Sequence, residues 1–224
     1  KIQADFVNLK EFTENASHEI QTPLAIIKSK LEMVLQDKTL DDQQHHRIRT
    51  AFESTIRLSK LNDSLLLLSK IENRQFVETN KIDICALVRS RLEYLEELFA
   101  LKQIEVTIHL EKQVKFILNP LLADILINNL LSNALRHNKE KGKIEVKSGN
   151  QEIVISNTSE RDEIDCSRMF RRFSKQTTLS ESNGLGLAIA HEICNSYNLE
   201  LNYQYINEMH CMTIRQKSQI STNS

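Results

Sequence analysis

The first 36 residues carry a regular apolar spacing that a single proline interrupts. This spacing predicts one long helix, from near residue 1 to about residue 36, whose apolar stripe packs against other helices. Pro23 weakens that helix, because a proline in a helix interior costs about 3 kcal/mol and crowds the carbonyl four residues earlier. That carbonyl belongs to Glu19, so we expect a loosened backbone beside His18. The stripe comprises Ile2, Phe6, Leu9, the weaker position Thr13, Ala16 and Ile20.

His18 lies off this stripe, next to a carboxylate. At about 100° per residue it stands roughly 160° round the helix from its two nearest stripe positions, so we expect it to face solvent or a docking partner. A lone histidine on a helix is usually an ordinary surface residue. His18 differs because Glu19 follows it directly and the pair Thr22-Pro23 comes one turn later.

A second helical pattern follows a short polar turn. Apolar positions recur from about residue 41 to residue 72, and two long helices joined by a short connection form an antiparallel hairpin. One hairpin cannot bury two apolar stripes, so we expect a dimer that completes a four-helix bundle. A plain coiled-coil spacer is the alternative, and the residues around His18 argue against it. The predicted domain is residues 1–72, with a polar linker at 73–81.

The period of the apolar pattern changes after the linker. Alternation typical of strands occurs at residues 81–85, 104–110, 114–118, 143–147, 152–155, 199–206 and 210–215. Helical patterns occupy residues 86–102, 120–138 and 187–196, and Asn119-Pro120 is typical of a helix N-cap followed by proline at the first position. We therefore expect an α/β domain at residues 82–217 and a loose polar tail at 218–224.

The helix predicted at residues 120–138 contains amides in its middle. Asparagine is a poor helix former, so propensity alone does not explain Asn129 and Asn133, which lie one turn apart. Arg136 and His137 continue the same face. An amide oxygen is a hard ligand suited to Mg²⁺, and arginine donates to phosphate oxygens. A solvated polar face is the alternative interpretation of this helix taken alone.

Composition excludes several classes of protein. Lys plus Arg (29) nearly balances Asp plus Glu (30), which disfavours electrostatic binding of nucleic acid or an anionic membrane. The four cysteines are scattered, as is typical of a reducing compartment. No apolar run approaches the roughly 18 to 20 residues of a membrane span. The chain starts at Lys1, without Met and inside the helical pattern, so we expect further sequence before it.

Four motifs occur in the order and spacing of one family. The series His-Glu-x-x-Thr-Pro-Leu at residues 18–24 resembles the phosphoacceptor box of two-component sensor histidine kinases. Residues 129–136, 169–173 and 183–189 resemble the N, F and G2 boxes of the same kinases. The resemblance implies an α hairpin, forming a four-helix bundle in the dimer, followed by an α/β two-layer sandwich of the Bergerat ATP-binding type. It also implies the cytoplasmic domain of a membrane-anchored bacterial sensor, reaching the membrane only through a segment absent from this chain.

The resemblance assigns roles to individual residues. His18 would receive the γ-phosphoryl group of ATP and pass it to an Asp of a response regulator, with Glu19 as general base or orienter. A Thr at the position of Thr22 is associated in this family with dephosphorylation of the regulator. Asn133 would hold Mg²⁺. The remaining predicted nucleotide contacts are Asn129 and Arg136 at phosphates, His137 near the base or ribose, Asn157 at the adenine, and Lys175, Gly184, Leu185 and Gly186 at phosphates.

The chain departs from the family pattern in its G1 box. Asn157 stands where the family has Asp, and Ser159 occupies a glycine position. An Asn side chain can accept from the adenine amino group and can also donate. Two other functions therefore stay open: an ATP-binding scaffold that transfers no phosphate, and an ATPase of the gyrase or chaperone type.

Overall fold

The computed structural model describes residues 2–160, 169–170 and 184–217, and for residues 2–18 it describes the helical backbone without the side chains. The chain divides between Asn73 and Arg74 into a helical unit and an α/β unit. The domain limits given above, at residues 72, 81 and 217, stay predictions.

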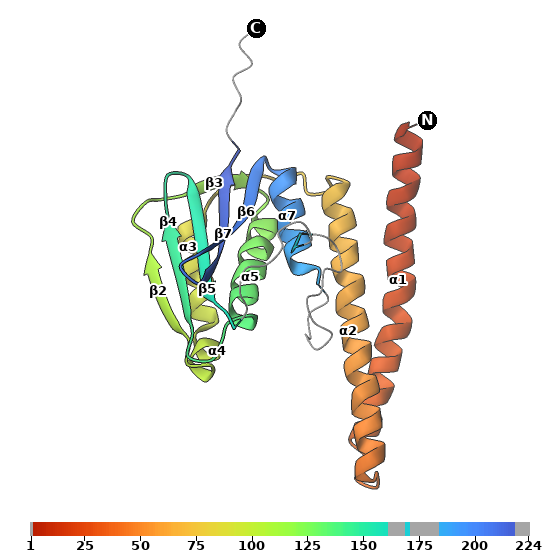
Figure 1. The fold of residues 1–224 in the computed structure, drawn as a ribbon. Helices are drawn as coiled ribbons and strands as arrows, with labels where there is room; N and C mark the ends of the chain where they lie inside the picture. The colour runs from red at the N-terminus through yellow and green to blue at the C-terminus, as the bar shows by residue number, and fades with distance from the viewer. Residues whose placement is uncertain (1, 161–168, 171–183, 218–224) are drawn as a thin grey trace. The chain divides into compact units, whose positions relative to one another are not determined.

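The helical unit is an antiparallel hairpin of α1 (Ile2–Leu35) and α2 (Asp42–Glu72) (Figure 1). A capping box starts α2: the Asp41 carboxylate accepts from the backbone N–H of Gln44 at 2.7 Å, and the Gln44 side chain accepts from the Asp41 N–H at 3.1 Å. Gln21 joins the two helices, because its Nε2 donates to Oδ1 of Asp63 at 2.9 Å. The predicted hairpin is thus confirmed, and α1 runs through Pro23 as one helix.

The hairpin buries only part of its apolar surface in one chain. Leu24 of α1 is 7% exposed, and Leu68 and Ile71 of α2 are each 2% exposed. By contrast, Ile27 is 47% exposed, and Ile20 and Val34, one heptad on either side of it, are 44% and 41% exposed. Ile20, the last position of the predicted stripe, thus forms with Ile27 and Val34 an open stripe on α1 that a single hairpin leaves exposed.

The α/β unit contains a mixed sheet and a small second sheet. Among the described residues, the larger sheet has the strand order β2-β4-β5-β7-β6, in which β2 runs parallel to β4 and every other pair is antiparallel. The smaller sheet pairs β1 with β3 antiparallel. The strands are β1 (Asn80–Asp83), β2 (Glu105–His109), β3 (Lys115–Leu118), β4 (Lys143–Ser148), β5 (Glu152–Thr158), β6 (Leu199–Ile206) and β7 (Met209–Gln216).

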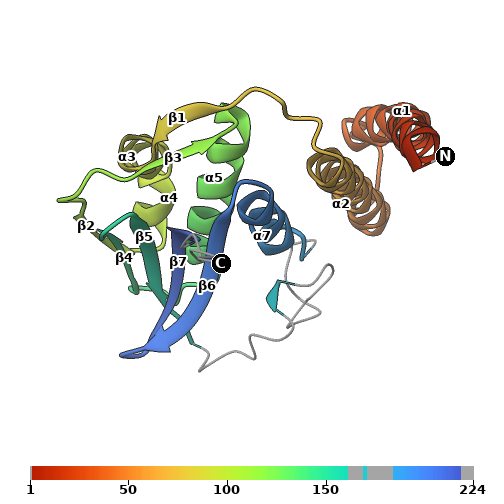
Figure 2. The ribbon, with the colours of Figure 1, turned by 90° about the horizontal axis from the view of Figure 1, so that it is seen from above.

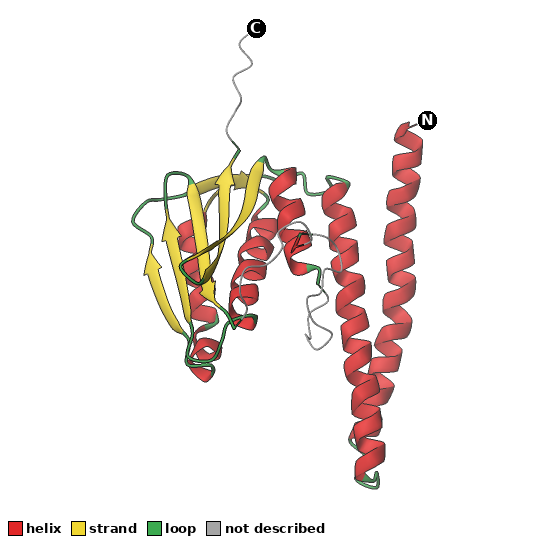
Figure 3. Cartoon of the chain, in the orientation of Figure 1, coloured by secondary structure: helices red, strands yellow, loops and turns green. Residues whose placement is uncertain are grey.

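Helices cover one face of the larger sheet. Figure 2 shows α5 (Pro120–Arg136) and α7 (Gly186–Ser196) side by side on this face, with α3 (Ile84–Tyr94) and α4 (Glu96–Leu101) next to α5. The core lies between the two layers, where Ile144 and Ile153 of the sheet and Leu126 of α5 are fully buried. Figure 3 displays the same sheet and helix layers, which confirm the predicted α/β sandwich.

Two element predictions were wrong in detail. The helix expected at residues 86–102 is broken at Leu95, which has φ −94° and ψ 0°, and the break keeps both Leu92 and Phe99 in the core. No glycine or proline marks this break in the sequence. The strand expected at residues 152–155 continues to Thr158, because β7 supplies pairing partners as far as Met209. Asn157 therefore lies inside a strand rather than after it.

Within the described ranges, no helix has the length and apolar character needed to cross a membrane.

Candidate functional site

The predicted amide stripe lies on α5, whose start follows from the sequence. The Asn119 side chain accepts from the N–H groups of Leu121 and Leu122 at 3.0 and 3.3 Å, and Pro120 takes the first helical position as predicted. The apolar face of α5 turns Leu126 and its neighbours into the core. Asn129 and Asn133 lie along the edge of that apolar face, three and seven positions after Leu126, and both are half-buried, whereas Arg136 and His137 beyond them are exposed.

Asn129 meets the start of α7. A methyl group placed on Gly186 would stand 3.4 Å from Oδ1 of Asn129, so the two helices approach closely there. The Nδ2 atom of Asn129 is buried and has no hydrogen-bond partner among the residues that the structure describes. Gly184 precedes the helix with φ 67°, a left-handed conformation that glycine adopts without strain, and Leu185 is 1% exposed.

This arrangement fits an anionic ligand. A buried amide N–H without a partner costs about 1–3 kcal/mol, which a phosphate oxygen at this point would offset. The N–H groups of the first turn of α7 favour negative charge in the same way. No group of three or more His, Cys, Asp or Glu side chains in the described part of the chain could hold a metal ion by itself. The amide oxygen of Asn133 suits Mg²⁺, which usually takes one or two protein ligands together with substrate phosphates.

Asn157 occupies a buried position at the end of β5, with 5% of its surface exposed. Its Nδ2 donates to the main-chain oxygen of Thr158 at 2.8 Å. His210 lies opposite it on β7 and is also 5% exposed. The hydroxyl of Tyr203 hydrogen-bonds to Nδ1 of His210 at 2.8 Å, and the Tyr205 ring lies 5.1 Å from the His210 ring. Asn157 therefore sits beside a buried aromatic cluster.

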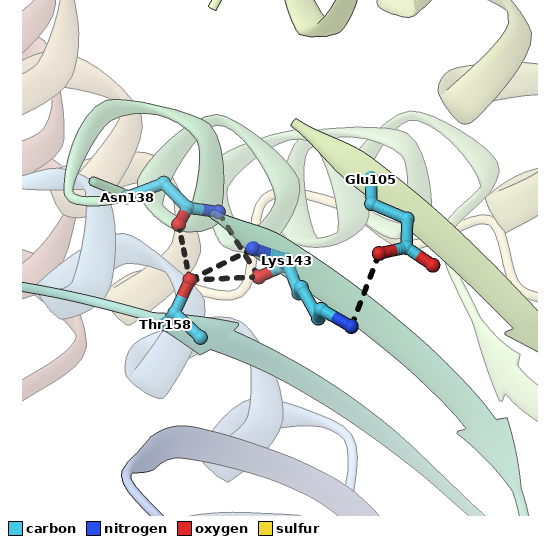
Figure 4. A network of polar contacts seen from close by, with 4 residues as sticks. All are labelled: Glu105, Asn138, Lys143 and Thr158. Atoms are coloured by element: carbon cyan, nitrogen blue, oxygen red, sulfur yellow. Dashed lines mark hydrogen bonds and ion pairs between the residues drawn. The ribbon is translucent and has the colours of Figure 1, made fainter. Parts of the chain in front are cut away.

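A polar network joins the end of α5 to the end of β5 (Figure 4). The Thr158 hydroxyl donates to Oδ1 of Asn138 at 2.7 Å and accepts from the Lys143 N–H at 2.8 Å. Asn138 in turn donates from Nδ2 to the Lys143 carbonyl at 3.1 Å, and the Lys143 ammonium pairs with Glu105 at 3.1 Å. Sequence reasoning missed this network. The one sequence feature that marks the network is Gly142, because a Cβ at this position would overlap Asn138 and stand 2.5 Å from the Thr158 hydroxyl.

The residues of the predicted F box are described only in part. Met169 is 8% exposed, and the Phe170 ring stacks on His191 of α7 with centroids 5.1 Å apart. Residues 171–173 lie outside the described residues, as does Lys175, which was predicted to contact phosphate.

The predicted phosphoacceptor motif lies on α1. His18 belongs to the helix, but its side chain lies outside the described residues. The side chains of Glu19 and Thr22 are exposed. The hydrogen bond from Gln21 to Asp63 fixes the next turn of α1 against α2. The roles predicted for His18, Glu19 and Thr22 remain untested by this geometry.

Family models match both units. Residues 8–74 match the His Kinase A (phospho-acceptor) domain, and residues 119–220 match the histidine kinase-, DNA gyrase B-, and HSP90-like ATPase. Together these matches include His18 and all of the predicted nucleotide contacts.

Curated relatives and solved structures agree with the family models. The heme sensor protein HssS of Staphylococcus aureus is 31% identical over 207 residues, which cover 89% of this chain and 44% of HssS. The chain thus spans less than half the length of these relatives. Full-length ShkA in complex with AMPPNP has a similar fold, with a TM-score of 0.72 at 18% identity over 92% of this chain and 45% of that one. The Acinetobacter baumannii histidine kinase AdeS has a TM-score of 0.60 at 21% identity over 90% of this chain and 98% of that one.

Proposed function

The chain belongs to the two-component histidine kinases, as a transmitter portion with a phosphoacceptor hairpin and an ATP-binding domain, and from this premise we propose that it phosphorylates His18 with ATP. The phosphoryl group would then pass from His18 to an aspartate of a response regulator. The observation that carries the proposal is the unpartnered Nδ2 of Asn129 beside Gly186, the first residue of α7.

The proposed step is an in-line displacement at phosphorus. A ring nitrogen of His18 attacks the γ-phosphorus, an N–P bond forms, and the bond from that phosphorus to the β–γ bridging oxygen breaks to release ADP. The exposed carboxylate of Glu19 takes the ring proton or orients the imidazole. Asn129, Arg136 and the first turn of α7 bind phosphate oxygens. Asn133 would hold Mg²⁺, which would supply positive charge to the phosphates.

A second copy of the chain is the partner of the hairpin. The open stripe of Ile20, Ile27 and Val34 on α1 supports this proposal, because these side chains are 41–47% exposed in a single hairpin. Burying these side chains in a four-helix bundle would stabilise the dimer by about 25 cal/mol for each Å² of apolar surface removed from water. The response regulator would dock on the same bundle, where Thr22 would also support dephosphorylation of the regulator. Because ATP and response regulators are found in the cytoplasm, the proposed function implies that this portion of the protein works there.

A nucleotide-binding scaffold without phosphotransfer is the second candidate, and the altered G1 residues Asn157 and Ser159 favour it. Incubation with Mg²⁺ and γ-labelled ATP separates the candidates. A kinase labels itself in a stoichiometric, acid-labile form, whereas a scaffold binds nucleotide without becoming labelled. An ATPase of the gyrase type would release labelled phosphate steadily and would continue to do so after His18→Gln.

A further inference from the structure

Two side chains of the α/β unit hold the linker that leads into it from α2. The Tyr197 hydroxyl, directly after α7, donates to the main-chain oxygen of Phe76 at 3.1 Å. Asn119, the N-cap of α5, donates from Nδ2 to the main-chain oxygen of Glu78 at 3.0 Å. We call Tyr197 and Asn119 the linker clamp, because together they fix the linker at two of its carbonyls.

The linker clamp leaves a short segment free between the two units. We propose that Arg74 and Gln75 form the pivot between the hairpin and the α/β unit, and that Tyr197 and Asn119 are positioning residues that set how often bound ATP reaches His18. This inference rests on the proposed function, since it requires that phosphate is transferred to His18.

The hairpin holds the chain as far as Asn73. The backbone N–H of Asn73 donates to the carbonyl of Ser69 at 2.9 Å, and its Nδ2 donates to the Ser69 hydroxyl at 3.3 Å. Asn73 is thus the C-cap of α2. Among the described residues, no hydrogen bond ties Arg74 or Gln75 to either unit. The boundary between the two units falls at the same place, between Asn73 and Arg74.

The backbone of Arg74 can change conformation at little cost. Its φ of 50° lies in the left-handed region, which costs a residue with a side chain about 1–2 kcal/mol. The Arg74 side chain is exposed, and that of Gln75 is half-buried. Rotation about the backbone of these two residues therefore breaks no hydrogen bond of the described part of the chain.

The linker clamp is anchored in the two helices that are proposed to bind the nucleotide. Oδ1 of Asn119 accepts from the N–H groups of Leu121 and Leu122, so its Nδ2 is left to donate to the linker. The Tyr197 N–H donates to the carbonyl of Ile193 in α7 at 3.2 Å. Burial raises the pKa of Tyr197, so its hydroxyl stays protonated and can donate at neutral pH. The linker is therefore expected to move together with α5 and α7.

A closed clamp keeps the tether between the two units short. With the clamp open, the free segment would grow from two residues to the six at positions 74–79, because β1 begins at Asn80. The local concentration of a tethered group falls roughly as the −3/2 power of tether length, so an open clamp should slow phosphorylation of His18 about fivefold. The clamp touches none of the proposed nucleotide contacts, so the affinity for ATP should stay the same.

Two substitutions open the clamp. Tyr197→Phe removes the hydroxyl and keeps the ring. Asn119→Asp removes the Nδ2 donor but still caps α5, because aspartate is as good an N-cap as asparagine. Tyr94→Phe is the matched control, since it removes a phenol hydroxyl from a side chain of α3 that is 75% exposed.

Limited proteolysis tests the clamp independently of kinase activity. Chymotrypsin cleaves after Phe76 only when the Phe76 carbonyl is released from its hydrogen bond, so the rate reports how often the clamp opens. Tyr197→Phe should raise this rate about twofold to tenfold, the effect of one lost hydrogen bond, and Tyr94→Phe should leave it unchanged. Mass spectrometry of the fragment 1–76 measures the rate. Equal rates in wild type and Tyr197→Phe would overturn the clamp.

Labelling kinetics test the positioning role. The double variant Tyr197→Phe/Asn119→Asp should label His18 with a kcat about fivefold below that of wild type and an unchanged KM for ATP, whereas Tyr94→Phe should match wild type. A domain that was merely destabilised would instead lose ATP binding. An unchanged or higher kcat in the double variant, with faster cleavage after Phe76, would refute the positioning role. A wild type that binds ATP without labelling His18 would refute the proposed function and leave the proteolysis result standing.

Discussion

Gly186 begins α7 where Asn129 of α5 comes close, and a methyl group on Gly186 would stand 3.4 Å from Oδ1 of Asn129. Two residues far apart in the sequence thus lie side by side, and the buried Nδ2 of Asn129 has no hydrogen-bond partner within the described ranges. The absence of a side chain at Gly186 leaves the first N–H groups of α7 accessible beside that amide.

Asn129→Leu should weaken ATP binding about tenfold while leaving the ligand-free protein as stable or slightly more stable. The substitution would remove the predicted phosphate donor, but it also removes a buried N–H that has no partner in the described part of the chain. Competition binding and thermal unfolding measure the two effects separately. Asn128→Leu on the same helix is the control, which should keep wild-type affinity. A large loss of stability with unchanged ATP affinity would contradict the account.

Asn133→Ala should abolish self-labelling by γ-labelled ATP at ordinary Mg²⁺ concentrations. The amide oxygen of Asn133 is the predicted Mg²⁺ ligand on α5, and the substitution would remove that ligand from beside the phosphates. A Mg²⁺ titration of the labelling rate is the measurement, and light scattering should still show the dimer. Labelling that keeps its wild-type Mg²⁺ dependence would remove Asn133 from the mechanism.

Gly142→Ala should destabilise the α/β unit by about 1–3 kcal/mol, in the range of overpacked cores. The added Cβ would overlap Oδ1 of Asn138 and stand 2.8 Å from the backbone oxygen of Lys139. Urea unfolding measures the change. Gly149→Ala is the matched control, because the three atoms nearest its Cβ all belong to the side chain of Glu152, which can move away, and it should cost well under half as much.

Ile27→Asp should convert the dimer to monomers at micromolar concentrations. Ile27 lies on the open stripe of α1 and is 47% exposed in one chain, and a charge there would be buried in the bundle. Ile206→Asp on β6 changes a side chain that is also 47% exposed, and it should leave the dimer intact. Size-exclusion chromatography with light scattering decides between them. If both variants were dimers, or both were monomers, the proposal that the open stripe forms the dimer interface would be refuted.

Asp83→Asn should lower stability at pH 7 and make no difference at strongly acidic pH. The hydrogen bond from Gln113 is the main cause that lowers the pKa of Asp83 below 3.8, and the backbone N–H of Ala86 at the start of α3 contributes. A carboxyl group whose pKa is lower in the folded state stabilises the fold. This stabilisation is complete above the pKa of the unfolded state and is lost as the pH falls through the pKa of the folded state. A charge at a helix N-terminus is typically worth about 0.3–1 kcal/mol. Urea unfolding should show a lower free energy of unfolding for Asp83→Asn than for wild type at pH 7, and equal values near pH 2.

Local rules predicted most of the fold. The capped start of α5 at Asn119-Pro120 and the length of α2 follow from propensity and periodicity, which act over a few residues. The break at Leu95 and the extension of β5 to Thr158 do not. Each depends on packing or pairing with a distant segment, and no glycine or proline marks either position.

In the candidate site, too, the sequence predicted single residues but not the contacts between distant segments. The motifs identified Asn129 and Gly186 separately, and the structure brings them together. The network of Asn138, Thr158 and Lys143 escaped prediction because two of its hydrogen bonds involve main-chain atoms of Lys143, which no side-chain pattern reveals. The contact from Nδ2 of Asn157 to the Thr158 carbonyl likewise involves a main-chain atom and was not predicted.

The most direct measurement of the central claim is acid-labile labelling of the purified chain by γ-labelled ATP, comparing wild type with His18→Gln and His45→Gln. His45 is a histidine on α2 outside every predicted motif, so its substitution controls for loss of an imidazole. The account predicts that wild type and His45→Gln acquire label at equal rates and that His18→Gln acquires none while still binding ATP. Label that persists in His18→Gln, or an unlabelled wild type that binds ATP and Mg²⁺, would contradict it.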